Sequence, residues 1–211
     1  MHQTQGLIDL DYIEHGFYEA TDSDTAQNPI LMTQVHSADA LVITQQPELP
    51  PEVDALITKT PGLNLTVKTA DCAPILIADA KARIIAAIHA GWKGAFQGII
   101  ETTILKMIEL GGNPDYMVAG IGPHLHKKSF EIDEKMYALF PKTEAHFFTP
   151  KEKGGLYDFD FHAYIVHRLQ RAGITHIDSV LIDTYSSEKY NSYRRNPKNP
   201  ARQFSPIMIK N

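Results

Sequence analysis

The 211-residue sequence lacks several features that would assign it to a broad class. Its one cysteine, Cys72, excludes an intrachain disulfide and fits a reducing compartment. Basic residues are not in excess, since 20 Lys and Arg stand against 25 Asp and Glu, so we expect no nucleic-acid partner. The most apolar segment, residues 84–90, is far shorter than the roughly 20 residues that span a bilayer. The N-terminus has no basic stretch followed by a long apolar run, so we expect a cytoplasmic protein without a membrane partner.

What is present is the composition of a globular protein. Hydrophobic residues make up 43% of the chain and charged residues 21%, which is enough apolar material to build a core without cross-links. We expect one domain over residues 1–211, because no linker, low-complexity tract or internal repeat divides the chain.

Short apolar segments predict many strands. Two of them, residues 74–78 and 83–88, are continuously apolar, as in strands covered on both faces. The predicted strands are residues 40–43, 55–57, 63–68, 74–78, 83–88, 117–121, 179–182 and 207–209.

Helical periodicity appears in three places. Apolar residues from Ala95 to Ile108 predict one continuous helix that ends at Gly111. Residues 133–140 and 161–169 predict two more, and residues 185–203 read as a long polar loop. Strands outnumber helices, so we expect an α/β (α+β) fold of layered mixed sheets flanked by helices.

Three short segments carry the candidate chemistry. They contain His36, Cys72 and His89, each at the edge of a predicted strand. Two imidazoles and one thiolate make a zinc-ligand set that leaves a fourth position open for water or substrate. The spacing alone does not demand a metal, because Cys72 could be a buried apolar residue and the histidines ordinary hydrogen-bonding groups.

The motifs resemble a known family. QVHSADAL, TADCAPIL and IAAIHAGWKGAF, with AGIGPHLHKKSFEI, SYRR and ARQ, are similar to laccase-domain or polyphenol oxidase-like proteins, also described as purine nucleoside phosphorylases. The resemblance implies an α/β domain of layered mixed sheets and zinc bound by His36, Cys72 and His89. It also implies phosphorolysis of adenosine, inosine, guanosine and S-methyl-5'-thioadenosine, with adenosine deaminase activity.

The chain departs from the family pattern at several points. Only residues 18–33 lie between Gly16-Phe17 and Gln34, where members usually carry a longer region with a Gly-rich loop and an Asn/Arg-containing helix. Asp183-Thr184 stands in place of a common Cys-Thr pair, and Lys93 in place of an arginine. These changes spare the three proposed metal ligands, so we expect them to affect substrate preference more than metal binding.

Other residues near the motifs have two interpretations each. Asp71 could orient a histidine or move a proton, or it could face away from the site. Lys93 lies where the helix begins and could help bind an anion, or it could be solvated. Arg194, Arg195 and Arg202 could hold phosphate, or they could pin the polar loop to carboxylates.

His124 and His126 form the one His-x-His pair, which we expect to be exposed rather than metal-bound. A true laccase needs about ten histidine ligands, several of them in such pairs. The chain has 10 histidines in all, mostly in unlike contexts, so we reject that activity.

Three functions therefore compete. The first is a zinc-dependent purine nucleoside enzyme, with nucleosides and phosphate as partners. The second is a cysteine hydrolase with Cys72 as nucleophile and His89 as base. The third is a non-catalytic zinc-binding module. The sequence leaves open whether the chain forms a homo-oligomer.

Overall fold

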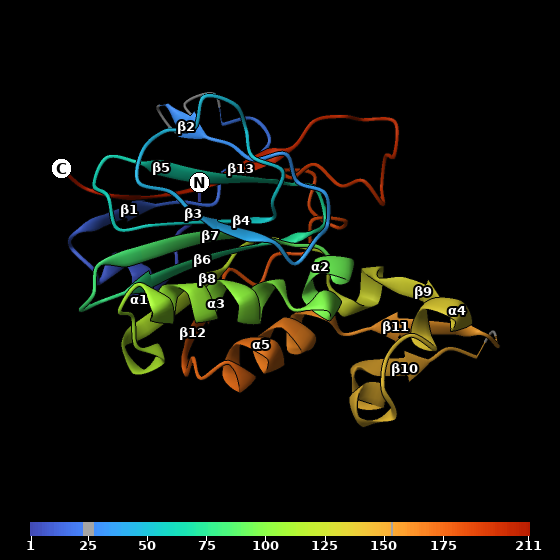
Figure 1. Ribbon diagram of the computed structural model, residues 1–211. Helices are drawn as coiled ribbons and strands as arrows, with labels where there is room; N and C mark the ends of the chain where they lie inside the picture. The colour runs from blue at the N-terminus through green and yellow to red at the C-terminus, as the bar shows by residue number, and fades with distance from the viewer. Residues whose placement is uncertain (23–27, 153) are drawn as a thin grey trace.

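A six-stranded mixed sheet lies at the centre of the protein. It is seen in a computed structural model that describes residues 1–22, 28–152 and 154–211 (Figure 1). The strand order is β12-β8-β6-β7-β4-β3, with parallel outer pairs and antiparallel inner pairs. The strands are β3 (Ala40–Val42), β4 (Ala55–Thr58), β6 (Ala73–Asp79), β7 (Ile84–Ala90), β8 (Met117–Ile121) and β12 (His176–Ser179).

Both faces of this sheet are covered. Every residue of β6 and β7 is buried, which explains their continuous apolar sequences. Side chains alternate along β6, so Ile75 and Ile77 face the helices while Leu76 faces a second sheet. The second sheet has the order β1-β13-β5-β2 and comprises β1 (Ile13–His15), β2 (Pro29–Ile30), β5 (Asn64–Thr69) and β13 (Gln203–Ile209).

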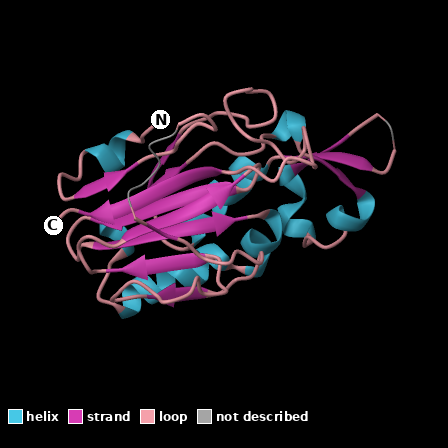
Figure 2. Cartoon of the chain, turned by 90° about the horizontal axis from the view of Figure 1, so that it is seen from above, coloured by secondary structure: helices cyan, strands magenta, loops and turns pink. Residues whose placement is uncertain are grey.

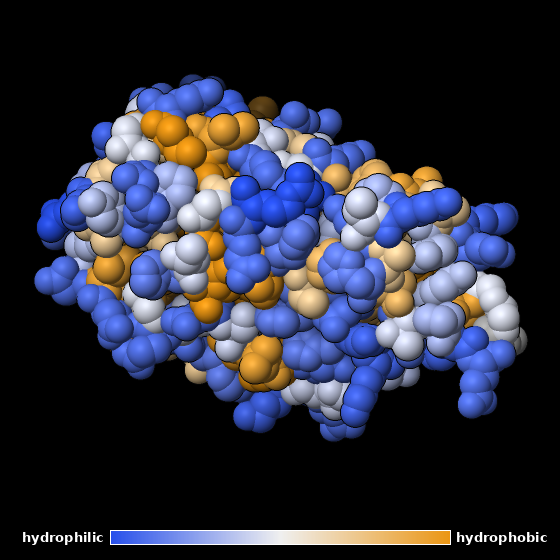
Figure 3. Space-filling view, turned by 90° about the horizontal axis from the view of Figure 1, so that it is seen from below, coloured by the Kyte–Doolittle hydropathy of each residue, from blue (hydrophilic) through white to orange (hydrophobic). Residues whose placement is uncertain are grey.

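Helices α3 (Ile99–Glu109) and α5 (Phe161–Arg171) cover the other face of the central sheet (Figures 1 and 2). Seen from this side, the surface is mainly hydrophilic with separated apolar patches (Figure 3). A short α1 (Gln5–Ile8) packs near β8. In the described residues, no helix combines the length and apolar character needed to cross a membrane.

A third sheet extends from one end of the molecule (Figure 1). It has the order β10-β11-β9, and an aromatic cluster joins it to α5 through Phe140, Phe159 and Tyr164. Its elements are β9 (Glu131–Asp133), α4 (Glu134–Tyr137), β10 (Phe148–Pro150) and β11 (Leu156–Phe159), and the chain also has 3-10 turns at Pro114–Tyr116, Lys127–Ser129 and Lys142–Phe147.

The layered mixed α/β fold is confirmed, with three local corrections. The predicted continuous helix is broken into α2 (Trp92–Gln97) and α3, because Gly98 adopts a left-handed φ of 103° between them. The predicted strand at residues 179–182 is displaced toward the N-terminus, where β12 pairs with β8. The short strands of the third sheet were not predicted. Residues 185–202 contain no helix or strand, as expected for the polar loop.

Candidate metal centre and cavity

The fold brings His36, Cys72 and His89 together at one end of the central sheet. Cys72 immediately precedes β6, and His89 is the next-to-last residue of β7. Because β6 and β7 are antiparallel, with Ala73 opposite Ala90, the start of one strand lies beside the end of the other. His36 reaches the same point from the loop between β2 and β3.

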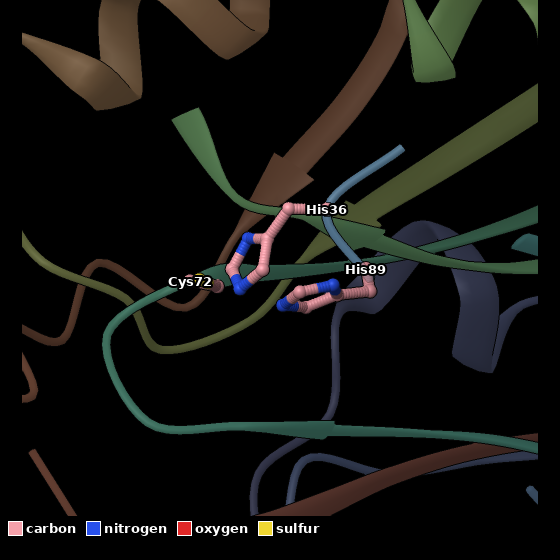
Figure 4. Close-up of side chains that lie close together, drawn as sticks. All are labelled: His36, Cys72 and His89. Atoms are coloured by element: carbon pink, nitrogen blue, oxygen red, sulfur yellow. The ribbon is translucent and has the colours of Figure 1, made fainter. Parts of the chain in front are cut away.

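The three side chains converge as metal ligands would. Their potential ligand atoms all lie within 4.8 Å of one another, and the imidazoles of His36 and His89 point toward Cys72 (Figure 4). Burial is graded across the group, since His36 is exposed, Cys72 is half-buried and His89 is buried. Two nitrogens and one sulfur in this arrangement could hold a metal ion while leaving one side accessible.

Asp54 supports two of these residues from a position just before β4. Its Oδ1 accepts a hydrogen bond from Nδ1 of His89 at 2.7 Å, which leaves the other ring nitrogen to face Cys72. The same carboxylate accepts backbone N–H bonds from Val35, His36 and Ser37. His36 has a left-handed φ of 62°, so these bonds hold the ligand loop in a conformation that costs energy.

The electrostatics of the group favour a charged His89 when no metal is present. Burial lowers the pKa of His89, but the negative charges of Cys72 and Asp54 outweigh it and raise that pKa to about 9. Burial and the charge of His89 lower the pKa of His36. Burial alone would raise the pKa of Asp54, yet hydrogen bonds from His89 and Ser37 hold it below its ordinary value. A metal cation would take the place of the proton on His89.

Gly91 provides the space for this arrangement. A Cβ atom there would lie 2.4 Å from Nδ1 of His36 and 3.2 Å from Sγ of Cys72. Any larger residue would push both side chains away from the cluster.

A cavity of about 1080 Å³ opens above the three residues. Its size suits a small organic molecule together with a small anion, since small-molecule sites occupy several hundred Å³. Aromatic and apolar side chains form much of the wall, and cations enter it from the polar loop. Besides the cluster, the lining includes Met32, Gln34, Lys68, Asp71, Trp92, Leu125, Phe130, Met136, Phe161, Tyr193, Arg194 and Arg202.

Asp71 lines this cavity, but its carboxylate is engaged elsewhere. Oδ1 accepts a hydrogen bond from Oγ1 of Thr184 at 2.7 Å, and Oδ2 accepts one from the backbone N–H of Arg194 at 2.6 Å. Its left-handed φ of 89° turns the carboxylate toward the polar loop. Asp71 therefore anchors that loop beside the cluster.

The four candidate phosphate-binding residues separate into two groups. Arg194 and Arg202 line the cavity, whereas Lys93 and Arg195 are not part of its wall. The Arg195 guanidinium donates to four backbone carbonyls, those of Thr184, Tyr185, Ser187 and Tyr190. Lys93 is exposed at the start of α2, with Nζ 5.7 Å from the Trp92 ring.

Arg194 and Arg202 also hold backbone groups. The guanidinium of Arg194 donates to the carbonyl of Glu131 at 3.1 and 3.2 Å and lies 5.8 Å from the ring of Phe130. Nη1 of Arg202 donates to the carbonyls of Ala201 and Asn199. These arginines therefore hold the polar loop in place by hydrogen bonds to backbone carbonyls. The alternative interpretation had named carboxylates as their partners.

The expectation that His124 and His126 are exposed is wrong. His124 is 1% exposed, and its Nδ1 lies 2.8 Å from the carbonyl oxygen of Gly122. His126 is half-buried. The pair follows β8 into a packed region, which a His-x-His spacing does not reveal.

Asp54 and Lys68 are the site residues that the motifs did not assign. Asp54 opens the DALIT segment, so its place before a strand was visible, but nothing in the spacing paired it with His89. Lys68 is the next-to-last residue of β5 and reaches the cavity wall.

Comparisons with known proteins identify relatives of this chain. The family model described as multi-copper polyphenol oxidoreductase laccase matches residues 16–210. Purine nucleoside phosphorylase RP494 of Rickettsia prowazekii is 36% identical over 174 residues, which cover 81% of this chain and 72% of the relative. Purine nucleoside phosphorylase YfiH of Escherichia coli is 32% identical over 186 residues, 86% of this chain and 74% of the relative.

Two crystal structures share the fold. The hypothetical protein YfiH of Bacillus licheniformis superimposes with a TM-score of 0.79 at 25% identity, covering 86% of this chain and 74% of that one. Protein NMB0706 of Neisseria meningitidis gives a TM-score of 0.78 at 26% identity, covering 87% and 75%. The layered arrangement of sheets is therefore common to these proteins.

Proposed function

Because the chain belongs to the family described as multi-copper polyphenol oxidoreductase laccase, and its relatives include proteins named purine nucleoside phosphorylase, we propose that it is a zinc-dependent enzyme of that activity. The proposed substrates are adenosine, inosine, guanosine and S-methyl-5'-thioadenosine, with phosphate as the second substrate. The proposal includes adenosine deaminase activity in the same cavity. A cytoplasmic location stays a prediction, and the oligomeric state stays open.

One observation carries the proposal: a two-histidine, one-cysteine cluster forms one side of a cavity of about 1080 Å³. Neutral imidazole and thiolate are ligands that zinc prefers, and three protein ligands with one open side are typical of catalytic zinc. When bound, zinc supplies Lewis-acid chemistry beside the substrate. The Asp54 carboxylate would keep His89 in the tautomer that a metal ligand needs.

The rest of the cavity supports binding of a nucleoside and an anion. The rings of Phe130, Trp92 and Tyr193 provide flat apolar surfaces for a purine. Arg194, Arg202 and Lys68 provide cations for phosphate, whose oxygen would attack the ribose carbon as the bond to the base breaks. The role of these side chains is to hold the two substrates in line and exclude water.

The cysteine-hydrolase alternative gains one specific observation. Cys72 acts electrostatically on His89, and His89 is hydrogen-bonded to Asp54, in the order nucleophile, base and orienting acid. That interpretation gives no role to His36, whose ring centroid lies 4.8 Å from that of His89. A metal site uses all three residues, so we favour it. We propose no laccase activity, because a true laccase needs about ten histidine ligands and the 10 histidines of this chain stand mostly in unlike contexts.

Metal analysis of the purified protein, paired with Cys72→Ala, tests the proposal. We expect zinc content to fall by about one ion per chain in the variant, since a three-ligand site does not survive loss of its thiolate. Chromatography of adenosine incubated with phosphate separates the functions: adenine reports phosphorolysis and inosine reports deamination. Metal-free protein with a readily alkylated Cys72 would instead favour the hydrolase, and bound zinc without product the non-catalytic module.

A further inference from the structure

Three histidines form a second cluster, away from the one just described. His124 and His126 follow β8, and His162 is the second residue of α5. The ring centroids lie 4.8 Å apart for His124 and His126, 5.3 Å for His124 and His162, and 6.0 Å for His126 and His162. No part of the proposed nucleoside chemistry uses them.

The buried nitrogens of this cluster are unpartnered within the described residues. Nε2 of His124, Nε2 of His126 and Nδ1 of His162 are shielded from solvent and make no hydrogen bond. Leaving a buried polar nitrogen without a partner destabilises the folded protein, so three of them together call for an explanation.

The tautomer of His124 points to a ligand. Its Nδ1 lies 2.8 Å from the carbonyl oxygen of Gly122, which can only accept, so Nδ1 carries the proton. Nε2 therefore presents a lone pair, and a backbone carbonyl on the opposite nitrogen is the usual support of a metal-binding histidine. Burial lowers the pKa of His124 to about 3 and also lowers the pKa of His126 and of His162, so all three rings are neutral.

The spacing of the rings suits one ion. With zinc–nitrogen bonds of 2.0–2.1 Å in a tetrahedral arrangement, imidazole centroids lie about 5 Å apart. The observed separations of 4.8, 5.3 and 6.0 Å bracket that value. Within the described residues, the first cluster is the one group whose ligand atoms already converge, so an ion bound by the three histidines requires their rings to rotate with their centres nearly fixed.

Two carboxylates lie near enough to offset a divalent charge. Asp160 acts electrostatically on His126 and His162, and Asp183 acts on His126. Asp183 is fixed by a hydrogen bond from Oγ of Ser129 at 2.5 Å. A cation bound among neutral imidazoles would therefore not be an uncompensated buried charge.

We propose that His124, His126 and His162 form a second, imidazole-only site for zinc or another divalent transition metal of the same preference. It would tie the segment after β8 to the start of α5. Leu125 and Phe161, the chain neighbours of these ligands, line the nucleoside cavity, whereas the three histidines do not. Occupancy would therefore stabilise one wall of the cavity without placing the ion in it.

Cobalt titration of a protein without the first site tests this assignment. In the double variant Cys72→Ala/His36→Ala we expect about one Co²⁺ to bind with visible d–d bands of a nitrogen-ligated, low-coordinate ion. We expect no sulfur-to-metal band, and a higher melting temperature with Co²⁺ or Zn²⁺ than without. Adding His162→Gln should abolish both effects, whereas adding His176→Gln, at an exposed histidine on β12, should leave them.

Failure of the double variant to bind Co²⁺ or Zn²⁺ would overturn the proposal. Equal binding by the His162→Gln and His176→Gln variants would overturn it too. If His162→Gln does not fold, His126→Gln replaces it, because that ring is also only half-buried. None of these measurements depends on nucleoside turnover, so failure of this proposal can be distinguished from failure of the proposed function.

Discussion

Oδ1 of Asp54 lies 2.7 Å from Nδ1 of His89 and 3.1 Å from the backbone nitrogen of His36. One buried carboxylate thus orients the ring of one proposed ligand and the backbone of another. Asp54 is 0% exposed, so both contacts act in a medium of low polarity, where they are strong.

Asp54→Asn should weaken metal binding by about 10- to 100-fold, the usual effect of losing a carboxylate behind a metal-binding histidine. The amide loses the charge that keeps His89 protonated on Nδ1. Competition with a zinc chelator measures the affinity. Asp39→Asn, at an exposed carboxylate on the same loop, is the matched control and should bind as the wild type does.

Gly91→Ala should remove the metal ion bound by His36, Cys72 and His89, and nucleoside turnover with it. The new Cβ would lie 2.4 Å from Nδ1 of His36, so the ring has to leave the cluster. Gly154→Ala is the control, because a Cβ at Gly154 meets nothing within 4 Å. Metal content and adenosine turnover of the two variants provide the comparison, and full zinc content in Gly91→Ala would refute the close packing described here.

The strands and the site were predictable to different degrees. Continuous apolar sequence located β6 and β7 because both faces of these strands are covered, and strand ends located Cys72 and His89. The third sheet was missed because its short strands depend on aromatic packing between separate segments, as between Phe140 and Tyr164 of α5. The break at Gly98 was missed because a single glycine is compatible with a helix until its φ is known.

Residues that act through a partner were the hardest to predict. Asp54 matters because it meets His89, 35 residues away, and no local pattern encodes that contact. Arg195 and Arg202 look alike in the sequence, yet one organises a loop and the other lines the cavity. The His124 pair was judged by its spacing, whereas its burial depends on α5 packing over it.

The free energy of unfolding should fall as the pH drops from about 6.5 to about 4, in part because His15 stays unprotonated in the folded protein over this range. Burial lowers the pKa of His15 to about 4, and its Nε2 accepts a hydrogen bond from the backbone nitrogen of Thr4 at 3.1 Å. Below pH 6.5 the unfolded chain takes up a proton that the folded protein excludes. Each such histidine therefore removes up to about 1.4 kcal/mol per pH unit in this window.

His15→Gln retains a hydrogen-bond acceptor but does not titrate. Urea unfolding at pH 7 and pH 5 should therefore show a smaller loss of stability for the variant, by about 2 kcal/mol. An equal loss in wild type and variant would show that His15 is charged in the folded protein.

Arg202→Ala should raise the KM for phosphate by about 10- to 100-fold, which corresponds to losing one hydrogen bond to a charged group. Its guanidinium lines the cavity and donates hydrogen bonds to the backbone carbonyls of Asn199 and Ala201 in its own loop. The melting temperature should change little. Steady-state kinetics with phosphate varied at saturating adenosine measure the effect, with Lys198→Ala, an exposed residue of the same loop, as the control.

Arg195→Ala, unlike Arg202→Ala, should lower the stability of the protein. The guanidinium of Arg195 donates hydrogen bonds to four carbonyls of the polar loop. We expect the free energy of unfolding to fall by about 1–3 kcal/mol, since several charge-assisted hydrogen bonds are lost. Turnover should fall because Arg194 and Tyr193, in the same loop, lose their place at the cavity wall. Thermal unfolding and kinetics on one preparation separate the roles: a raised KM for phosphate at unchanged stability would make Arg195 a substrate-binding residue instead.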